Sequence, residues 1–250
     1  LLWSVEEARR RGVHQIGASA CGATALLNAF AALGTGSHYE PAEVNAAVAT
    51  HLRRPGGGLK DYLQSRAAAG ATHEDLINAC KLLPDAKVSA HFVAYCDVTK
   101  NGTGFLEWCY DEVCAGGVPV LCMNLQQLAE CDSPNWIPDA WHHQMVFGVD
   151  LDRRVVYLAN PLCEMTELDL HRVLLSERVL LVRDQDVYEQ AQLGASASAE
   201  DLSAISPAWS ELDVGKCASD IVKAFDPSLI KHSYLKIPAA YQTGATVLRR

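Results

Sequence analysis

A cysteine at the start of an apolar helix constrains this chain more than any other feature. Cys21 and Gly22 open a run of small and apolar residues, 23–33, which ends at a glycine-containing turn over residues 34–36. Such a run predicts a buried helix. The N–H groups and positive dipole at its start favour a thiolate over a thiol. Gln15 lies shortly before Cys21, where its amide can donate to an oxyanion above the sulfur.

Other patterns place helices early in the chain and strands later. We predict helices over residues 4–12, 41–52, 59–69, 72–83 and 105–115, and strands over residues 88–94, 119–123, 142–150, 154–159 and 179–182. A polar loop is expected over residues 124–140. Helices that precede mostly sequential strands indicate an α+β fold, in which the N-terminal helices pack on an antiparallel sheet.

Two of the predicted strands end in polar residues that suit a thiol site. His142 opens the strand 142–150, and Asn160 ends the next strand, directly before Pro161. In antiparallel neighbours the start of one strand lies against the end of the other. The Asn160 carbonyl can then accept from one imidazole nitrogen and leave the other nitrogen facing a thiol.

In these segments the chain resembles the papain-like cysteine peptidases, and most of all the subgroup similar to bacteriocin-leader (double-glycine) peptidases. That pattern combines a Gln-to-Cys-Gly-Ala motif with a His-initiated strand and an Asn/Asp-Pro strand end. The resemblance covers roughly residues 13–161. It implies that Cys21 is the nucleophile, His142 the base, Asn160 the residue that orients the base, and Gln15 the oxyanion donor. Bacteriocin-leader enzymes more often carry Asp at the position of Asn160, which is typical of papain itself.

The histidine that acts as base has two candidates. The spacing to Gly148 in the family pattern selects His142. The alternative is His143, whose side chain points to the opposite face because side chains alternate along a strand. We prefer His142 and keep His143 as the alternative.

The implied activity is peptide-bond cleavage through a covalent acyl-thioester. The base takes the Cys21 proton and gives a thiolate–imidazolium pair, in which the pKa of the thiol is depressed. An acyl- or amide-transferring enzyme is a second possibility, because the same intermediate can react with an amine. An inactive binding module is a third, and the four filled catalytic positions argue against it. For Cys21 itself, a buried structural cysteine is the ordinary alternative.

Composition limits the partners and the compartment. With 21 basic and 30 acidic residues and a formal net charge of -9, a nucleic-acid surface is not expected, and no apolar run is long enough to span a membrane. The nine cysteines show no paired spacing and favour reduced thiols in a cytoplasmic protein. Because the chain starts at Leu1, the sequence leaves a removed leader open.

Partners, cofactors and domains complete the expectations. His142, His143, Cys131 and Cys163 match no familiar zinc spacing, so we expect no metal and no other cofactor. The expected partner is a protein or peptide substrate, and the sequence leaves the oligomeric state open. We predict a catalytic domain over residues 1–190 and a C-terminal extension, 191–250, packed on that core.

Overall fold

The computed structural model describes residues 2–36, 39–52, 69–100, 102–124, 141–159, 171–174 and 241–250. Its helices are α1 (Val5–Arg11), α2 (Cys21–Ala32), α3 (Pro41–Val48), α5 (His73–Leu82), the 3-10 helix η1 (Pro84–Ala86), α6 (Tyr95–Lys100) and α7 (Phe105–Cys114). Its strands are β1 (Ser89–Ala94), β2 (Val118–Asn124), β3 (Trp141–Asp150), β4 (Val155–Ala159), β5 (His171–Leu174) and β6 (Gly244–Arg249). None of these helices has the length and apolar character needed to cross a bilayer.

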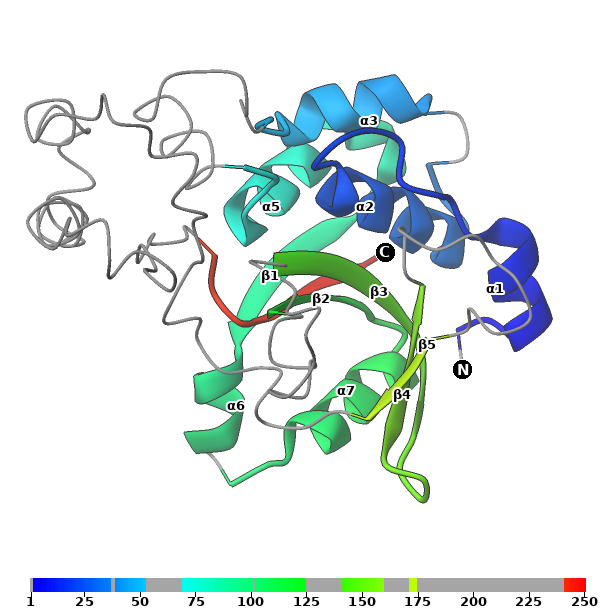
Figure 1. Ribbon diagram of the computed structural model, residues 1–250. Helices are drawn as coiled ribbons and strands as arrows, with labels where there is room; N and C mark the ends of the chain where they lie inside the picture. The colour runs from blue at the N-terminus through cyan, green and yellow to red at the C-terminus, as the bar shows by residue number, and fades with distance from the viewer. Residues whose placement is uncertain are drawn as a thin grey trace, which may run out of the picture.

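The strands form one six-stranded sheet in the order β1-β6-β2-β3-β4-β5, and every neighbouring pair is antiparallel. Helices α1, α2, α3 and α5 cover one face of this sheet, and α6 and α7 cover the other (Figure 1). The predicted combination of helices with an antiparallel sheet is therefore confirmed.

Side-chain hydrogen bonds form capping boxes at the starts of three helices, α1, α3 and α5. Ser4 and Glu7 form a reciprocal capping box at the start of α1, and Thr72 and Asp75 form another at the start of α5. Helix α2, which begins at Cys21, differs, because its N-cap residue Ala20 supplies no side-chain hydrogen bond. The N–H groups of the first turn of α2 are therefore not held by a capping side chain.

The helix α3 is shorter than the sequence predicts. We expected it to run to residue 52, but it ends at Val48 because Ala49 adopts a left-handed conformation with φ of 53°. Beyond that point His51 pairs with Gly70 through two backbone hydrogen bonds of 2.9 and 2.8 Å. This tertiary pairing replaces the last helical turn and fixes the segment that leads into α5.

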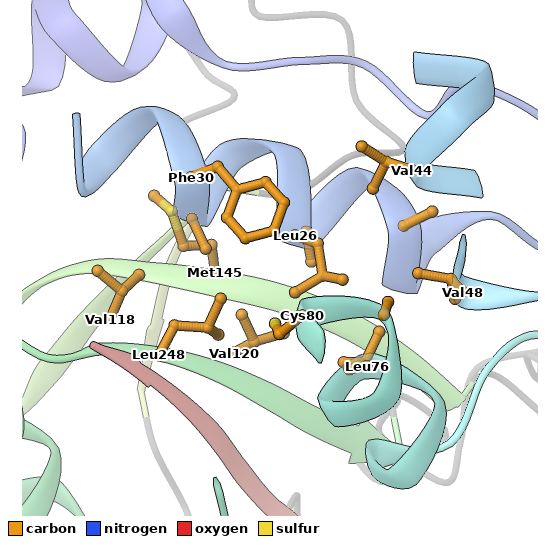
Figure 2. Close-up of a cluster of buried hydrophobic side chains, with 14 of the residues drawn as sticks. Leu26, Phe30, Val44, Val48, Leu76, Cys80, Val118, Val120, Met145 and Leu248 are labelled. Atoms are coloured by element: carbon orange, nitrogen blue, oxygen red, sulfur yellow. The ribbon is translucent and has the colours of Figure 1, made fainter. Parts of the chain in front are cut away.

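The larger hydrophobic core lies between α2 and the sheet. Leu26 and Phe30 of α2 are fully buried against Val120 of β2, Met145 of β3 and Leu248 of β6 (Figure 2). A second core on the other face is built from α7, α6 and the opposite side of the same strands. The sheet therefore separates two packed layers, and β2, β3, β4 and β6 contribute side chains to both.

Residues 244–249, near the C-terminus, form an inner strand of the sheet. β6 lies between β1 and β2, with Gly244 opposite Ala94 on one side and Cys122 on the other. The sequence analysis assigned these residues to the extension 191–250 and predicted no strand for them. The proposed boundary near residue 190 lies outside the described residues. So do the elements expected at 59–69 and 179–182.

Candidate active site

The structure brings one predicted pair together across 122 sequence positions. Cys21 is the first residue of α2, and its Sγ lies 3.9 Å from Nδ1 of His143 on β3. Both side chains are buried, with exposed fractions of 8% for Cys21 and 1% for His143. The distance suits a thiol that donates to a neutral imidazole nitrogen, since sulfur hydrogen bonds are longer than those of oxygen.

The histidine that the structure places against Cys21 Sγ is His143, the alternative candidate, whereas the sequence analysis preferred His142. His143 shares its face of β3 with Met145 and Phe147, which pack in the core beneath α2. His142 falls on the other face with Val146, in the layer that α7 covers. A shift of one residue along a strand exchanges its two faces, so motif spacing alone could not choose between adjacent histidines.

Burial controls the protonation of this pair. Burial raises the pKa of the Cys21 thiol, against the opposing effect of the backbone N–H groups of His143, Gly22 and Cys21. Burial, together with smaller contributions from the charges of His142 and His73, lowers the pKa of His143 to about 3. At neutral pH the pair is therefore a thiol and a neutral imidazole. The expected depression of the thiol pKa is not found, because desolvation outweighs the hydrogen bonds.

The geometry also assigns the tautomer of His143. If Nδ1 accepts from the Cys21 thiol, the ring proton lies on Nε2, which becomes a donor. Nε2 is buried and has no hydrogen-bond partner among the described residues. A buried donor without an acceptor costs about 1–3 kcal/mol, so this atom is the place where an orienting acceptor belongs.

Asn160, the predicted orienting residue, lies outside the described residues. It directly follows Ala159, the last residue of β4, which pairs with Met145 of β3. Met145 is close along β3 to His143. The role of Asn160 remains a prediction.

Gln15 occupies the turn before α2. Its Nε2 donates to the Gly17 carbonyl oxygen over 2.9 Å. Ser19, between Gly17 and the helix, has a left-handed φ of 59° and so bends the chain into the first turn. One amide hydrogen of Gln15 is committed to this loop, and the second is the one available to an oxyanion. Its oxyanion role remains a prediction.

Three residues around His143 were missed by the sequence analysis. Cys122 of β2 is the direct ladder partner of His143. His73, the first residue of α5, stacks on Phe92 with ring centroids 3.9 Å apart. Tyr241 meets the His143 ring edge-on at 6.4 Å. Only the alternation of buried residues in β2 could have indicated Cys122. The other two are brought in by elements distant in sequence.

The described residues contain no group of three or more His, Cys, Asp or Glu side chains arranged to hold a metal ion. The residue after Cys21 packs against apolar side chains and the imidazole of His143. A Cβ on Gly22 would meet Ala71 and Leu76 at 3.1 Å each and His143 Nδ1 at 3.7 Å. Gly22 therefore lets α2 approach both α5 and the imidazole closely.

Comparison with known proteins gives one structural resemblance. No protein-family model matches the sequence, and no curated protein is similar enough to count as a match. A crystal structure of a candidate C39-like peptidase from Bacillus anthracis resembles the chain with 19% sequence identity and a TM-score of 0.38. The match covers 60% of this chain and 79% of that one. A resemblance at this level assigns no activity, so the function is argued from the site.

Proposed function

We propose that this chain is a papain-like cysteine peptidase in which Cys21 is the nucleophile and His143 is the general base. The observation that carries the proposal is the 3.9 Å approach of Cys21 Sγ to His143 Nδ1 at the start of α2. A thiol, a base and the positive end of a helix are the parts that nucleophilic thiol catalysis requires. Here all three meet on one face of the sheet.

The proposed reaction starts from neutral partners. As the Cys21 sulfur attacks the substrate carbonyl, its proton moves to Nδ1 of His143. The N–H groups at the uncapped start of α2 and the Gln15 amide then stabilise the oxyanion. His143 returns the proton to the leaving amine, and water hydrolyses the acyl-thioester. Because both groups are buried, proton transfer during attack avoids maintaining a buried ion pair in the resting enzyme.

Asn160 completes the proposal as the acceptor for His143 Nε2. The buried, unpartnered Nε2 supports it, together with the position of Asn160 directly after β4. An amide oxygen there would hold the ring with Nδ1 toward Cys21 and would stabilise the imidazolium formed during attack. Asn160→Ala should therefore lower turnover while leaving Cys21 in place.

The test measures the reactivity of Cys21 and peptide cleavage together. Iodoacetamide is added in limiting amount, and mass spectrometry follows alkylation of each cysteine in the wild type, His143→Ala and His142→Ala proteins. Cleavage is followed with a proteome-derived peptide library and sequencing of new termini. Cys80→Ala is the matched control, because Cys80 is another buried helical thiol, with a pKa raised to about 12.

We expect Cys21→Ala to abolish cleavage and Cys80→Ala to preserve it. We also expect wild-type Cys21 to be alkylated faster than Cys80, and this advantage to be lost in His143→Ala. Cleavage that persists in Cys21→Ala, or a Cys21 no more reactive than Cys80, would overturn the proposal.

A further inference from the structure

We propose that Cys122 is a resolving thiol, which forms a reversible disulfide with Cys21 when a hydroperoxide oxidises the nucleophile. Formation of this disulfide would place the candidate active site under redox control. This inference rests on the proposed function in one respect, because it takes Cys21 as the reactive thiol of the chain.

The sheet register places Cys122 beside the site. Cys122 of β2 is directly opposite His143 of β3, whose Nδ1 lies 3.9 Å from Cys21 Sγ. Directly opposed residues of an antiparallel pair have Cα atoms about 4.5–5.5 Å apart and side chains on the same face. Cys122 therefore projects toward the layer that contains α2, as Val120 of the same strand does.

The two thiols also interact electrostatically. Burial raises the pKa of Cys122, and negative charge on Cys21 would raise it further, as expected for two thiols in one neighbourhood. Cys122 is 2% exposed, so a bulky external thiol does not reach it easily. A thiol buried in this way reacts instead with an electrophilic sulfur generated inside the protein. Such a sulfur is what oxidation of Cys21 would create.

The other cysteines of the described residues are placed differently. Cys80 lies on α5 in the core beneath α2, and Cys109 is buried on α7 in the opposite layer. Cys96 and Cys114 are exposed at the surface. Within the described part of the chain, Cys122 is the cysteine that the register places opposite the imidazole that contacts Cys21. It is the one we assign as the partner.

The chemistry needs only a hydroperoxide such as hydrogen peroxide. The Cys21 sulfur attacks the peroxide O–O bond and is oxidised to a sulfenic acid, and the peroxide is reduced to water. The Cys122 sulfur then attacks the sulfenic sulfur. An S–S bond forms, the S–OH bond breaks, and the hydroxyl leaves as water with the Cys122 proton. A dithiol reductant returns both cysteines to thiols.

The disulfide would have two consequences. It would block the nucleophile, so the proposed peptidase would be inactive while oxidised. It would also stop Cys21 at a reversible stage, because a sulfenic acid without a resolving thiol is oxidised further to an irreversible sulfinic acid.

The experiment treats the full chain with hydrogen peroxide and reads the cysteines by non-reducing peptide mapping. The proteins are the wild type, Cys122→Ala and the control Cys80→Ala, with native-gel mobility and circular dichroism to confirm folding. We expect a Cys21–Cys122 linked peptide, about 2 Da lighter than the sum of the two free-thiol peptides, in wild type and Cys80→Ala. Subsequent dithiothreitol should restore alkylation of Cys21 at least about tenfold.

In Cys122→Ala we expect no linked peptide and instead an irreversible gain of about 32 Da on Cys21. Reversible protection of Cys21 in this folded variant would overturn the proposal, as would linkage of Cys21 to a different cysteine in the wild type. If Cys122→Ala fails to fold, Cys122→Ser and Cys122→Val replace it. The presence or absence of the Cys21–Cys122 linked peptide in the wild type still decides the proposal. Mapping needs no peptidase assay, so a linked peptide without cleavage would sink the proposed function only.

Discussion

The two faces of the sheet carry adjacent histidines in different surroundings. On the face beneath α2, His143 is buried against Cys21, and its Nε2 is left for an acceptor. On the face beneath α7, His142 is buried in a layer whose neighbouring core side chains are apolar, such as Val146 and Leu158. The two residues share a strand and a residue type. What differs is the element packed over each of them.

The position of the candidate site therefore depends on which layer a side chain enters, and motif spacing along the chain does not fix it. β3 places His143 in the layer that also contains the start of α2 and therefore Cys21. The adjacent residue, His142, lies in the opposite layer, which does not contain Cys21. A purely sequential reading treats the two histidines as nearly equivalent. Because α2 packs against one face of the sheet, the two histidines have different surroundings. The predictions below test this difference between the two faces.

The largest expected effect separates the two histidines directly. His143→Ala should lower peptide cleavage by about 10²–10⁴-fold, the usual worth of a general base. His142→Ala should leave the rate per folded molecule close to that of the wild type, although it can lower stability, because Cys21 lies on the other face of the sheet. Turnover of library peptides, normalised to the folded fraction by circular dichroism, measures both. Equal losses of turnover in the two variants would contradict the proposed difference between the two faces of the sheet.

A pair of leucines tests the two cores in the same way. Leu26 of α2 and Leu106 of α7 are both buried, on opposite faces of the sheet. Leu26→Ala and Leu106→Ala should each lower the free energy of unfolding by about 2–5 kcal/mol, measured by urea denaturation. Only Leu26→Ala should also slow alkylation of Cys21, because α2 carries that thiol. A comparable slowing by Leu106→Ala would show that the layers are coupled.

Substitution of Gly244 tests the packing of β6 between β1 and β2. A Cβ at this position would lie 2.3 Å from the Val93 carbonyl oxygen and 2.6 Å from Cζ of Phe92. Gly244→Ala should therefore lower the free energy of unfolding by about 1–3 kcal/mol, since the neighbouring backbone of β1 must move. The control is Gly17→Ala, where the added methyl meets only Ala20 at 3.9 Å. Matched thermal unfolding curves for the two variants would contradict the packing described for β6.

The pH dependence of stability tests the burial of His143 on the face beneath α2. The pKa of His143 is lowered from 6.5 to about 3 by burial, so the unfolded chain binds a proton that the folded chain does not. Stability from this group is complete above pH 6.5 and falls as the pH drops toward 3, by at most about 1.4 kcal/mol per pH unit.

His143→Asn removes this titration. Between pH 7 and about pH 4 its free energy of unfolding should therefore decline less than that of the wild type. Urea denaturation at successive pH values measures the difference. Parallel curves for the two proteins would mean that His143 is not held neutral by burial.

Local patterns predicted much of the described secondary structure. The helix that begins at Cys21 and the capped helix after Thr72 were both expected, because capping residues and apolar periodicity act within a few residues. β6 was not expected, although its buried residues Ala245 and Val247 are apolar. Its partners β1 and β2 lie far earlier in the chain, and nothing within residues 244–249 specifies that pairing.

The candidate site divides in the same manner. The sequence by itself determined the nucleophile candidate and the α+β composition, and it limited the candidate base to two adjacent histidines. Only the tertiary structure placed His143 against Cys21, placed Cys122 opposite His143 and set the neutral protonation of Cys21 and His143. The physical reason is that residue type and spacing act along the chain. Strand face, ladder partner and desolvation depend on which segments pack together.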